Sequence, residues 1–129
     1  MGLEYQLQLN LVKMAHISFL AYTFSSVTED QITVGLLYAD DEDQVTPFIS
    51  TERLKILKKV APSHIYKNFC NYIKALQKNK ITLADLKYLS IYQNGFIKIT
   101  NPGPTAADLD QAKMMFELHI DKNYKEDGN

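Results

Sequence analysis

The sequence is poor in the residue types that carry most of the chemistry at protein sites. It has 129 residues, with one cysteine, no tryptophan and three histidines. Because Cys70 stands alone, no disulfide forms within the chain, and a four-cysteine zinc site is excluded. His16, His64 and His119 are never three or four residues apart, the spacing that places two metal ligands on one helix face. We therefore expect no metal and no cofactor.

Motifs of common enzymes and nucleotide-binding proteins are missing as well. The chain has no GxSxG, HExxH, GxGxxG or P-loop pattern. The acidic run Asp40–Asp43 does not fit a calcium loop counted from Asp41, because Thr46 stands where an EF-hand needs glycine. In the segment 101–104, prolines remove the N–H groups that a phosphate cradle would use. The sequence therefore favours a protein that is not an enzyme.

Long hydrophobic runs are also absent. The longest nearly uncharged stretch, 14–28, is shorter than the ~20 apolar residues that a membrane-spanning helix needs. Residues 1–12 alternate polar and apolar side chains, unlike the continuous apolar core of a signal peptide. With 46% hydrophobic and 22% charged residues, the composition is that of a globular domain. We expect a cytoplasmic protein without membrane contact, with one domain over 1–122 and a polar, frayed tail over 123–129.

The first forty residues have the patterns of strands. Residues 5–11 alternate apolar and polar side chains, and His16–Phe24 is rich in β-branched and aromatic residues. Ile32–Tyr38 is the most apolar stretch of the chain, which predicts a central strand covered on both faces. Gly35 inside this stretch indicates a β-bulge or a close neighbour, since glycine has no side chain to pack there.

A turn and a further strand are expected next. The acidic residues Asp40–Asp43 predict a solvated turn, because four neighbouring carboxylates are poorly accommodated in a core. Val45–Ile49 then returns as a strand. Pro47 within it cannot donate to a sheet ladder, so we place this strand at an edge of the sheet.

The second half of the chain is expected to be mostly helical. Four polar residues that favour helix starts precede apolar residues at helical spacing. Pro62 separates the first two helices, and Asp85 completes a sequence that resembles a capping box at the third. The expected capping residues are Ser50, Ser63, Thr82 and Thr105.

A β-hairpin is predicted before the last helix. Ser90–Gln93 and Phe96–Thr100 are joined by Asn94-Gly95, a pair that tolerates the positive φ angles of a type I′ turn. The complete pattern indicates an α+β fold. Its sheet is small and mainly antiparallel, built from the amino-terminal strands and the late hairpin, and helices pack on it as a single pair of layers.

Two of these segments resemble a known family. Gln31–Tyr38 is similar to the apolar strand of the bacterial domain-of-unknown-function family 3037, with Thr33 where that family usually has asparagine. Tyr92–Pro102, followed by a capped helix, resembles the family's carboxy-terminal hairpin, proline turn and last helix. The family has no established catalytic residues to carry over. Its members are often encoded beside a kinase-like toxin, so the resemblance implies a role that depends on a partner.

Charge is unevenly distributed along the chain, although the net charge is −1. Residues 1–51 hold one basic and seven acidic side chains (−6), whereas residues 52–87 hold nine basic and two acidic ones (+7). A basic helical face of this kind arises from simple solvation of helices, and it also suits phosphates or an acidic protein. The residues of this candidate interaction face are Arg53, Lys55, Lys58, Lys59, Lys67, Lys74 and Lys78.

These observations favour a non-enzymatic protein-interaction domain. The resemblance to family 3037 implies that it is the accessory partner of a toxin-like or defence-like protein encoded in the same bacterial operon. One alternative is nonspecific nucleic-acid binding through the lysine-rich face. With a single arginine and no tryptophan, base-specific readout is disfavoured. A second alternative is an enzyme with scattered residues, which would show as a deep pocket gathering histidines or carboxylates. The sequence leaves homo-oligomer formation open.

Overall fold

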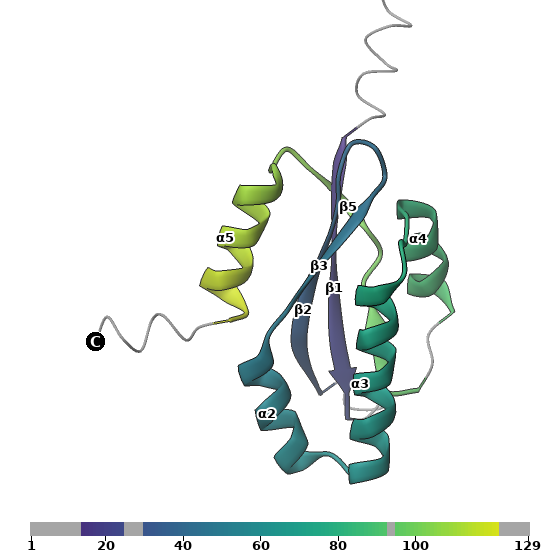
Figure 1. Ribbon diagram of the computed structural model, residues 1–129, viewed down its shortest axis with the longest axis vertical. Helices are drawn as coiled ribbons and strands as arrows, with labels where there is room; N and C mark the ends of the chain where they lie inside the picture. Colours follow the sequence, from purple (N-terminus) through teal and green to yellow (C-terminus); the bar gives the residue numbers. More distant parts are fainter. Residues whose placement is uncertain (1–13, 25–29, 93–94, 122–129) are drawn as a thin grey trace, which may run out of the picture.

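The computed structural model describes residues 14–24, 30–92 and 95–121 (Figure 1). The strand expected at 5–11 and the tail at 123–129 lie outside these residues. In chain order the elements are β1 (Ala15–Thr23), β2 (Gln31–Ala39), β3 (Val45–Ile49), α2 (Thr51–Val60), α3 (Ser63–Lys78), α4 (Leu83–Ile91), β4 (Ile97–Ile99), β5 (Gly103–Thr105) and α5 (Leu109–His119).

The described strands form one antiparallel sheet with β1 at its centre. The order is β3-β2-β1-β4, and β5 also pairs with β1. Strand β5 pairs with the first residues of β1, Ala15–Ile17, whereas β4 pairs with Leu20–Tyr22 further along. On the other side of β1, strand β2 pairs with it over nearly its whole length. The predicted antiparallel sheet is confirmed.

Helices cover both faces of this sheet (Figure 1). Helices α2, α3 and α4 pack on one face, where Leu57, Phe69 and Leu86 join a core with β1 and β2. Helix α5 packs on the other face through Ala112 and Phe116. The α+β class is confirmed, and β2 is covered on both faces as predicted. The sheet and α2–α4 form the expected pair of layers, and α5 adds a third.

A β-bulge in β2 lets both faces of this strand be apolar. Leu20 pairs with Gly35 but Ala21 pairs with Thr33, so Val34 is an extra residue without a partner in β1. The extra residue reverses the alternation of side chains. Consequently the residues of β2 that face α2–α4 have even numbers up to the bulge residue and odd numbers after it. They are Ile32, Val34, Leu37 and Ala39.

Strand β3 lies at the edge of the sheet, as Pro47 predicted. Val45 donates its N–H to Ile81 outside the sheet, at 3.2 Å, whereas Ser50 donates to Val34 of β2 at 2.8 Å. Alternate residues point their N–H groups the same way, so an N–H at Pro47 would point away from β2. Proline therefore costs this strand no ladder hydrogen bond.

The acidic turn Asp40–Asp43 is confirmed between β2 and β3. The Asp40 carboxylate accepts hydrogen bonds from the backbone N–H groups of Glu42 and Gln44, each at 2.9 Å. Asp43 adopts a positive φ of 67°, which aspartate tolerates better than most residues. Asp41, Glu42 and Asp43 are exposed to solvent.

The predicted hairpin at Ser90–Thr100 is wrong. Helix α4 continues to Ile91, so Ser90 is helical, and β4 pairs with β1 instead. The pairing with β1 buries Ile99 almost completely, a gain that an isolated two-stranded hairpin does not offer. Gly95 still adopts a positive φ of 54°, while Asn94 lies outside the described residues.

Two of the four predicted helix caps are also wrong. Ser63 is the first residue of α3, and Pro62 occupies the cap position without a side-chain hydrogen bond. Thr105 belongs to β5, where its hydroxyl accepts from the N–H of Ala107 in a local turn. Asp108 caps α5 instead, in a capping box with Gln111. The caps at Ser50 and Thr82 are confirmed, the latter as a capping box with Asp85.

No helix in the described ranges is long and apolar enough to cross a membrane.

Gly35→Ala tests the close packing behind the bulge. A Cβ at Gly35 would lie 2.8 Å from Cδ1 of Ile49 and 3.0 Å from the carbonyl oxygen of Phe48. We expect the free energy of unfolding to fall by about 1–3 kcal/mol, because an overpacked strand must shift. Urea denaturation measures the change. Gly103→Ala is the matched control, since a Cβ there meets no atom within 4 Å. Equal effects of the two changes would contradict this account.

Candidate interaction surface

Helix α3 presents a stripe of three lysines to solvent. Lys67, Lys74 and Lys78 are exposed. On the opposite side of the helix Phe69 and Ile73 are buried against the sheet. The helix contains no acidic residue, so nothing on α3 itself neutralises the three ammonium groups. We call these three residues the lysine stripe.

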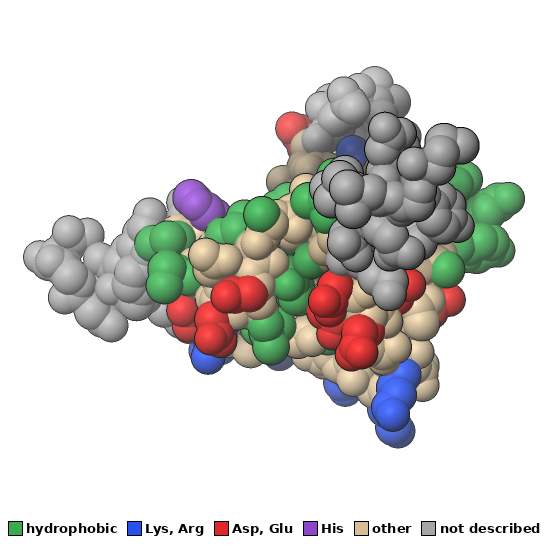
Figure 2. All heavy atoms as spheres, turned by 90° about the horizontal axis from the view of Figure 1, so that it is seen from above, with side chains coloured by type: hydrophobic (Ala, Val, Ile, Leu, Met, Phe, Trp, Pro, Cys, Tyr) green, Lys and Arg blue, Asp and Glu red, His purple; other side chains and the backbone are tan. Residues whose placement is uncertain are grey.

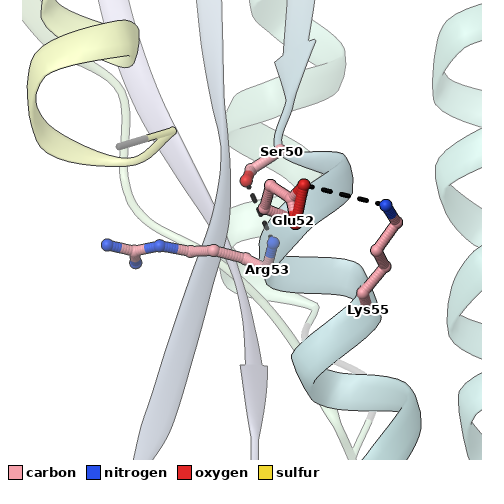
Figure 3. A network of polar contacts seen from close by, with 4 residues as sticks. All are labelled: Ser50, Glu52, Arg53 and Lys55. Atoms are coloured by element: carbon pink, nitrogen blue, oxygen red, sulfur yellow. Dashed lines mark hydrogen bonds and ion pairs between the residues drawn. The ribbon is translucent and has the colours of Figure 1, made fainter. Parts of the chain in front are cut away.

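Helix α2 adds three further lysines to the outer side of the helical layer. Lys55, Lys58 and Lys59 are exposed, whereas Leu57 faces the core and is fully buried. Lys55 forms an ion pair with Glu52 at 3.7 Å (Figure 3). Six of the seven residues predicted for the interaction face therefore lie on the solvent side of α2 and α3.

Arg53 does not join the lysines. Its guanidinium donates to the carbonyl oxygen of Thr33 in β2 at 2.8 Å and to that of His119 at the end of α5 at 3.2 Å. Figure 3 shows the side chains of Arg53 and Lys55 leaving α2 in opposite directions. The pairing of β2 with β3 ends at Gly35 and Ile49, so Thr33 has no partner residue in β3. The Arg53 guanidinium donates to the Thr33 carbonyl in its place. Arg53 is thus a structural link between the two helical layers.

An apolar pocket of about 450 Å³ opens between α3 and β4. Phe69 lies at its base and is almost fully buried. Tyr72 is half-buried beside it, and burial raises the pKa of the Tyr72 hydroxyl. No described histidine or carboxylate lines the pocket. Among the described residues, its lining consists of Ile65, Asn68, Phe69, Asn71, Tyr72, Phe96 and Ile97.

Aromatic rings around Tyr22 build one wall of this pocket. Tyr22 makes an edge contact with Phe69 at 5.4 Å between centroids and stacks on Phe96 at 5.9 Å. Phe24 packs against Tyr22 from the other side, at 5.0 Å. Phe96 and Phe24 remain 42% and 40% exposed, so apolar surface continues from the pocket to the outside.

Further large apolar side chains are exposed at the end of α4, shortly before Phe96 in the chain. Ile91 is 72% exposed, and Tyr88 and Tyr92 are 60% and 63% exposed. The two tyrosine rings pack on each other at 4.5 Å. Clustered exposure of such residues marks interaction sites more often than isolated exposure does.

The lysine stripe begins next to the rim of the pocket: Lys67 and Lys74 lie about one turn of α3 from Asn71, and Lys78 follows about two turns from it. A helix turns about 100° per residue, which places Asn71 within about 60° of each of Lys67, Lys74 and Lys78. The same geometry places Asn71 about 60° from Asn68 on its other side. Both asparagines are exposed and line the pocket. Polar amides thus form the border between the apolar pocket and the cationic stripe.

Three acidic side chains, Asp40, Asp41 and Asp108, lie near the other end of β1. A second pocket, of about 440 Å³, is lined there by Ala15, Asp41 and Asp108 among others. Tyr38 donates from its hydroxyl to the carbonyl of Ala107 at 2.8 Å. Burial, then the nearby carboxylates of Asp108, Asp40 and Asp41, raise the pKa of Tyr38. Figure 2 shows acidic side chains gathered on this end of the molecule.

The histidines and the cysteine are not brought together. His64 is exposed, Cys70 is half-buried, and His119 is exposed on α5. The pKa of Tyr66 is raised, first by a hydrogen bond with the Cys70 side chain, then by burial and by the charge of the Cys70 thiolate. Nδ1 of His16 is buried without a partner among the described atoms. In residues 14–24, 30–92 and 95–121, no three His, Cys, Asp or Glu side chains could hold a metal ion.

Sequence reasoning identified the lysines but missed the pocket. The pocket needs Phe96 and Ile97, which the expected hairpin would have turned toward Ser90–Gln93. Tyr66 and Tyr72 are half-buried and pack against the core under α3.

Comparisons with protein-family models, with curated proteins and with solved structures give no match. The resemblance to family 3037 therefore stays a prediction.

Arg53→Gln tests the link between the helical layers. The variant loses two hydrogen bonds from a charged donor to backbone carbonyls, so we expect the free energy of unfolding to fall by about 1–3 kcal/mol. Lys55→Gln, on the same helix, removes only an exposed ion pair and should cost less than about 0.5 kcal/mol. Chemical denaturation of both variants measures the difference. A larger loss for Lys55→Gln would contradict the role given to Arg53.

Proposed function

We propose that this protein is a non-enzymatic protein-interaction domain. The observation that carries the proposal is the apolar pocket between α3 and β4, bordered by exposed aromatic side chains and by the lysine stripe. Binding sites for proteins combine a desolvated apolar centre with a polar or charged rim. The pocket and its rim have this composition.

Nucleic-acid binding is the second candidate, and the six exposed lysines of α2 and α3 favour it. Two features make it the weaker one. Arg53, the only arginine of the chain, is engaged by backbone carbonyls. Phosphate contacts are made by charged and polar groups, so the apolar pocket takes part in nucleic-acid binding only if an unpaired base stacks in it.

The kind of partner follows only from the resemblance described above. If the chain is related to family 3037, the partner is a toxin-like or defence-like protein encoded in the same bacterial operon. The proposal then places both proteins in the cytoplasm and makes the domain an accessory component.

Affinity capture from a lysate of the host tests the proposed function. The immobilised chain is compared with the variant Lys67→Glu/Lys74→Glu/Lys78→Glu, after nuclease treatment and at salt near ~200 mM. We expect the native chain to retain a protein under these conditions, because an apolar interface tolerates moderate salt. Nucleic acid held by lysines should be released steeply between ~50 and ~200 mM salt.

The charge-matched control is Lys80→Glu/Lys87→Glu/Lys113→Glu, which changes three exposed lysines outside the stripe. We expect capture to be at least tenfold weaker for the stripe variant and nearly unchanged for the control. If only nucleic acid is retained, the nucleic-acid candidate replaces this proposal. If both variants lose the captured protein equally, the effect is one of net charge, and the lysine stripe has no specific role in binding.

A further inference from the structure

We infer that the pocket between α3 and β4 receives one large apolar side chain from an acidic segment of the partner protein, whose carboxylates lie on the lysine stripe. The inference rests on the proposed function and deepens it, since it specifies the chemistry of the partner.

The apolar anchor follows from the shape and lining of the pocket. Its volume of about 450 Å³ lies in the range of sites that enclose a small organic group. Phe69 and Ile97 offer an apolar base, and the half-exposed ring of Phe96 offers a face on which an aromatic or branched aliphatic side chain can pack. No described charged residue lines the pocket, so a charged anchor would be desolvated without a partner.

The two asparagines at the rim of the pocket favour a bound segment in extended conformation. Asn68 and Asn71 are exposed and line the pocket. Each carries an amide with both donors and an acceptor, which matches the N–H and C=O groups of a peptide backbone passing over the pocket. Glutamate or lysine at these positions would offer only one of the two functions.

The acidic character follows from the charge of α3. Lys67 and Lys74 lie about one turn from Asn71, and Lys78 continues the same side of a helix without acidic residues. An acidic segment anchored in the pocket would pass within reach of these ammonium groups. A basic or neutral segment would leave them uncompensated, and charge complementarity therefore selects the acidic one.

The acidic turn of a second copy of this chain fits less well. Asp40–Asp43 is followed by Gln44, so this turn would supply charge to the stripe without a large apolar anchor for the pocket.

Selection from a displayed random-peptide library tests the inference with the intact chain. We expect the enriched peptides to combine one Phe, Leu, Ile or Met with two or more Asp or Glu residues within the next few positions. The affinity of one enriched, fluorescently labelled peptide is then measured by anisotropy against a peptide with serine in place of the anchor. We expect this second peptide to bind at least tenfold more weakly.

Two variants separate the pocket from the stripe. Asn68→Trp places a bulky ring at the mouth of the pocket on an exposed position, and should weaken binding at least tenfold. Lys67→Glu/Lys74→Glu/Lys78→Glu should weaken binding by a similar factor and reverse its dependence on salt. The control Lys80→Glu/Lys87→Glu/Lys113→Glu should keep the affinity within about threefold. Circular dichroism of each variant verifies that the fold is retained.

The inference is overturned if no peptide is enriched, if enriched peptides are neutral or basic, or if folded Asn68→Trp binds as well as the native chain. Stronger binding of a single-stranded oligonucleotide than of any peptide would also overturn it, as would self-association through this surface in sedimentation experiments. If a captured protein is lost by the stripe variant but retained by Asn68→Trp, the proposed function stands and only this inference fails.

Discussion

The pairing of β1 on both of its sides is the constraint on which the rest of the structure depends. Strand β2 follows β1 closely in the chain, but β4 and β5 come from residues about eighty positions later. Thr100 lies where the chain passes between these two short strands. Its N–H donates to the Phe19 carbonyl at 3.0 Å, and its hydroxyl accepts from the Phe19 N–H at 2.8 Å. Ser18, which is fully buried, donates its hydroxyl to the Thr100 carbonyl.

The candidate site is a consequence of this pairing. Because Ile97 pairs with Tyr22, Phe96 stacks on the Tyr22 ring. Phe69 of α3 makes an edge contact with the same ring. Apolar surface of three distant segments thus meets at one end of β1. Arg53 acts at the other edge of the sheet, where it holds the start of α2 to β2 and to the end of α5. The single arginine of the chain is accordingly used for architecture, and the lysines are left for solvent or a partner.

Charge along the sequence becomes charge in space because of the way the chain is layered. The basic residues 52–87 form α2–α4, which cover one face of the sheet, and the acidic turn between β2 and β3 lies near the start of β1. The pocket bordered by lysines and the pocket bordered by aspartates therefore lie at opposite ends of the central strand. A partner that recognises one of them need not cover the other.

Elements with local signals could be predicted from the amino-acid sequence. Ser50 and the Thr82–Asp85 pair start helices as expected, Pro47 lies in an edge strand, and Gly35 lies next to a bulge. The exposure of the lysines follows from helical spacing alone. The partner of β4, the contacts of Arg53 and the pocket could not be predicted, because they depend on the packing of distant segments. In each case a contact between residues far apart in the chain overrode or completed the local preference. The Asn94-Gly95 turn favoured a hairpin, but burial of Ile97 and Ile99 against β1 stabilised the alternative more, and it is this long-range pairing that created the site.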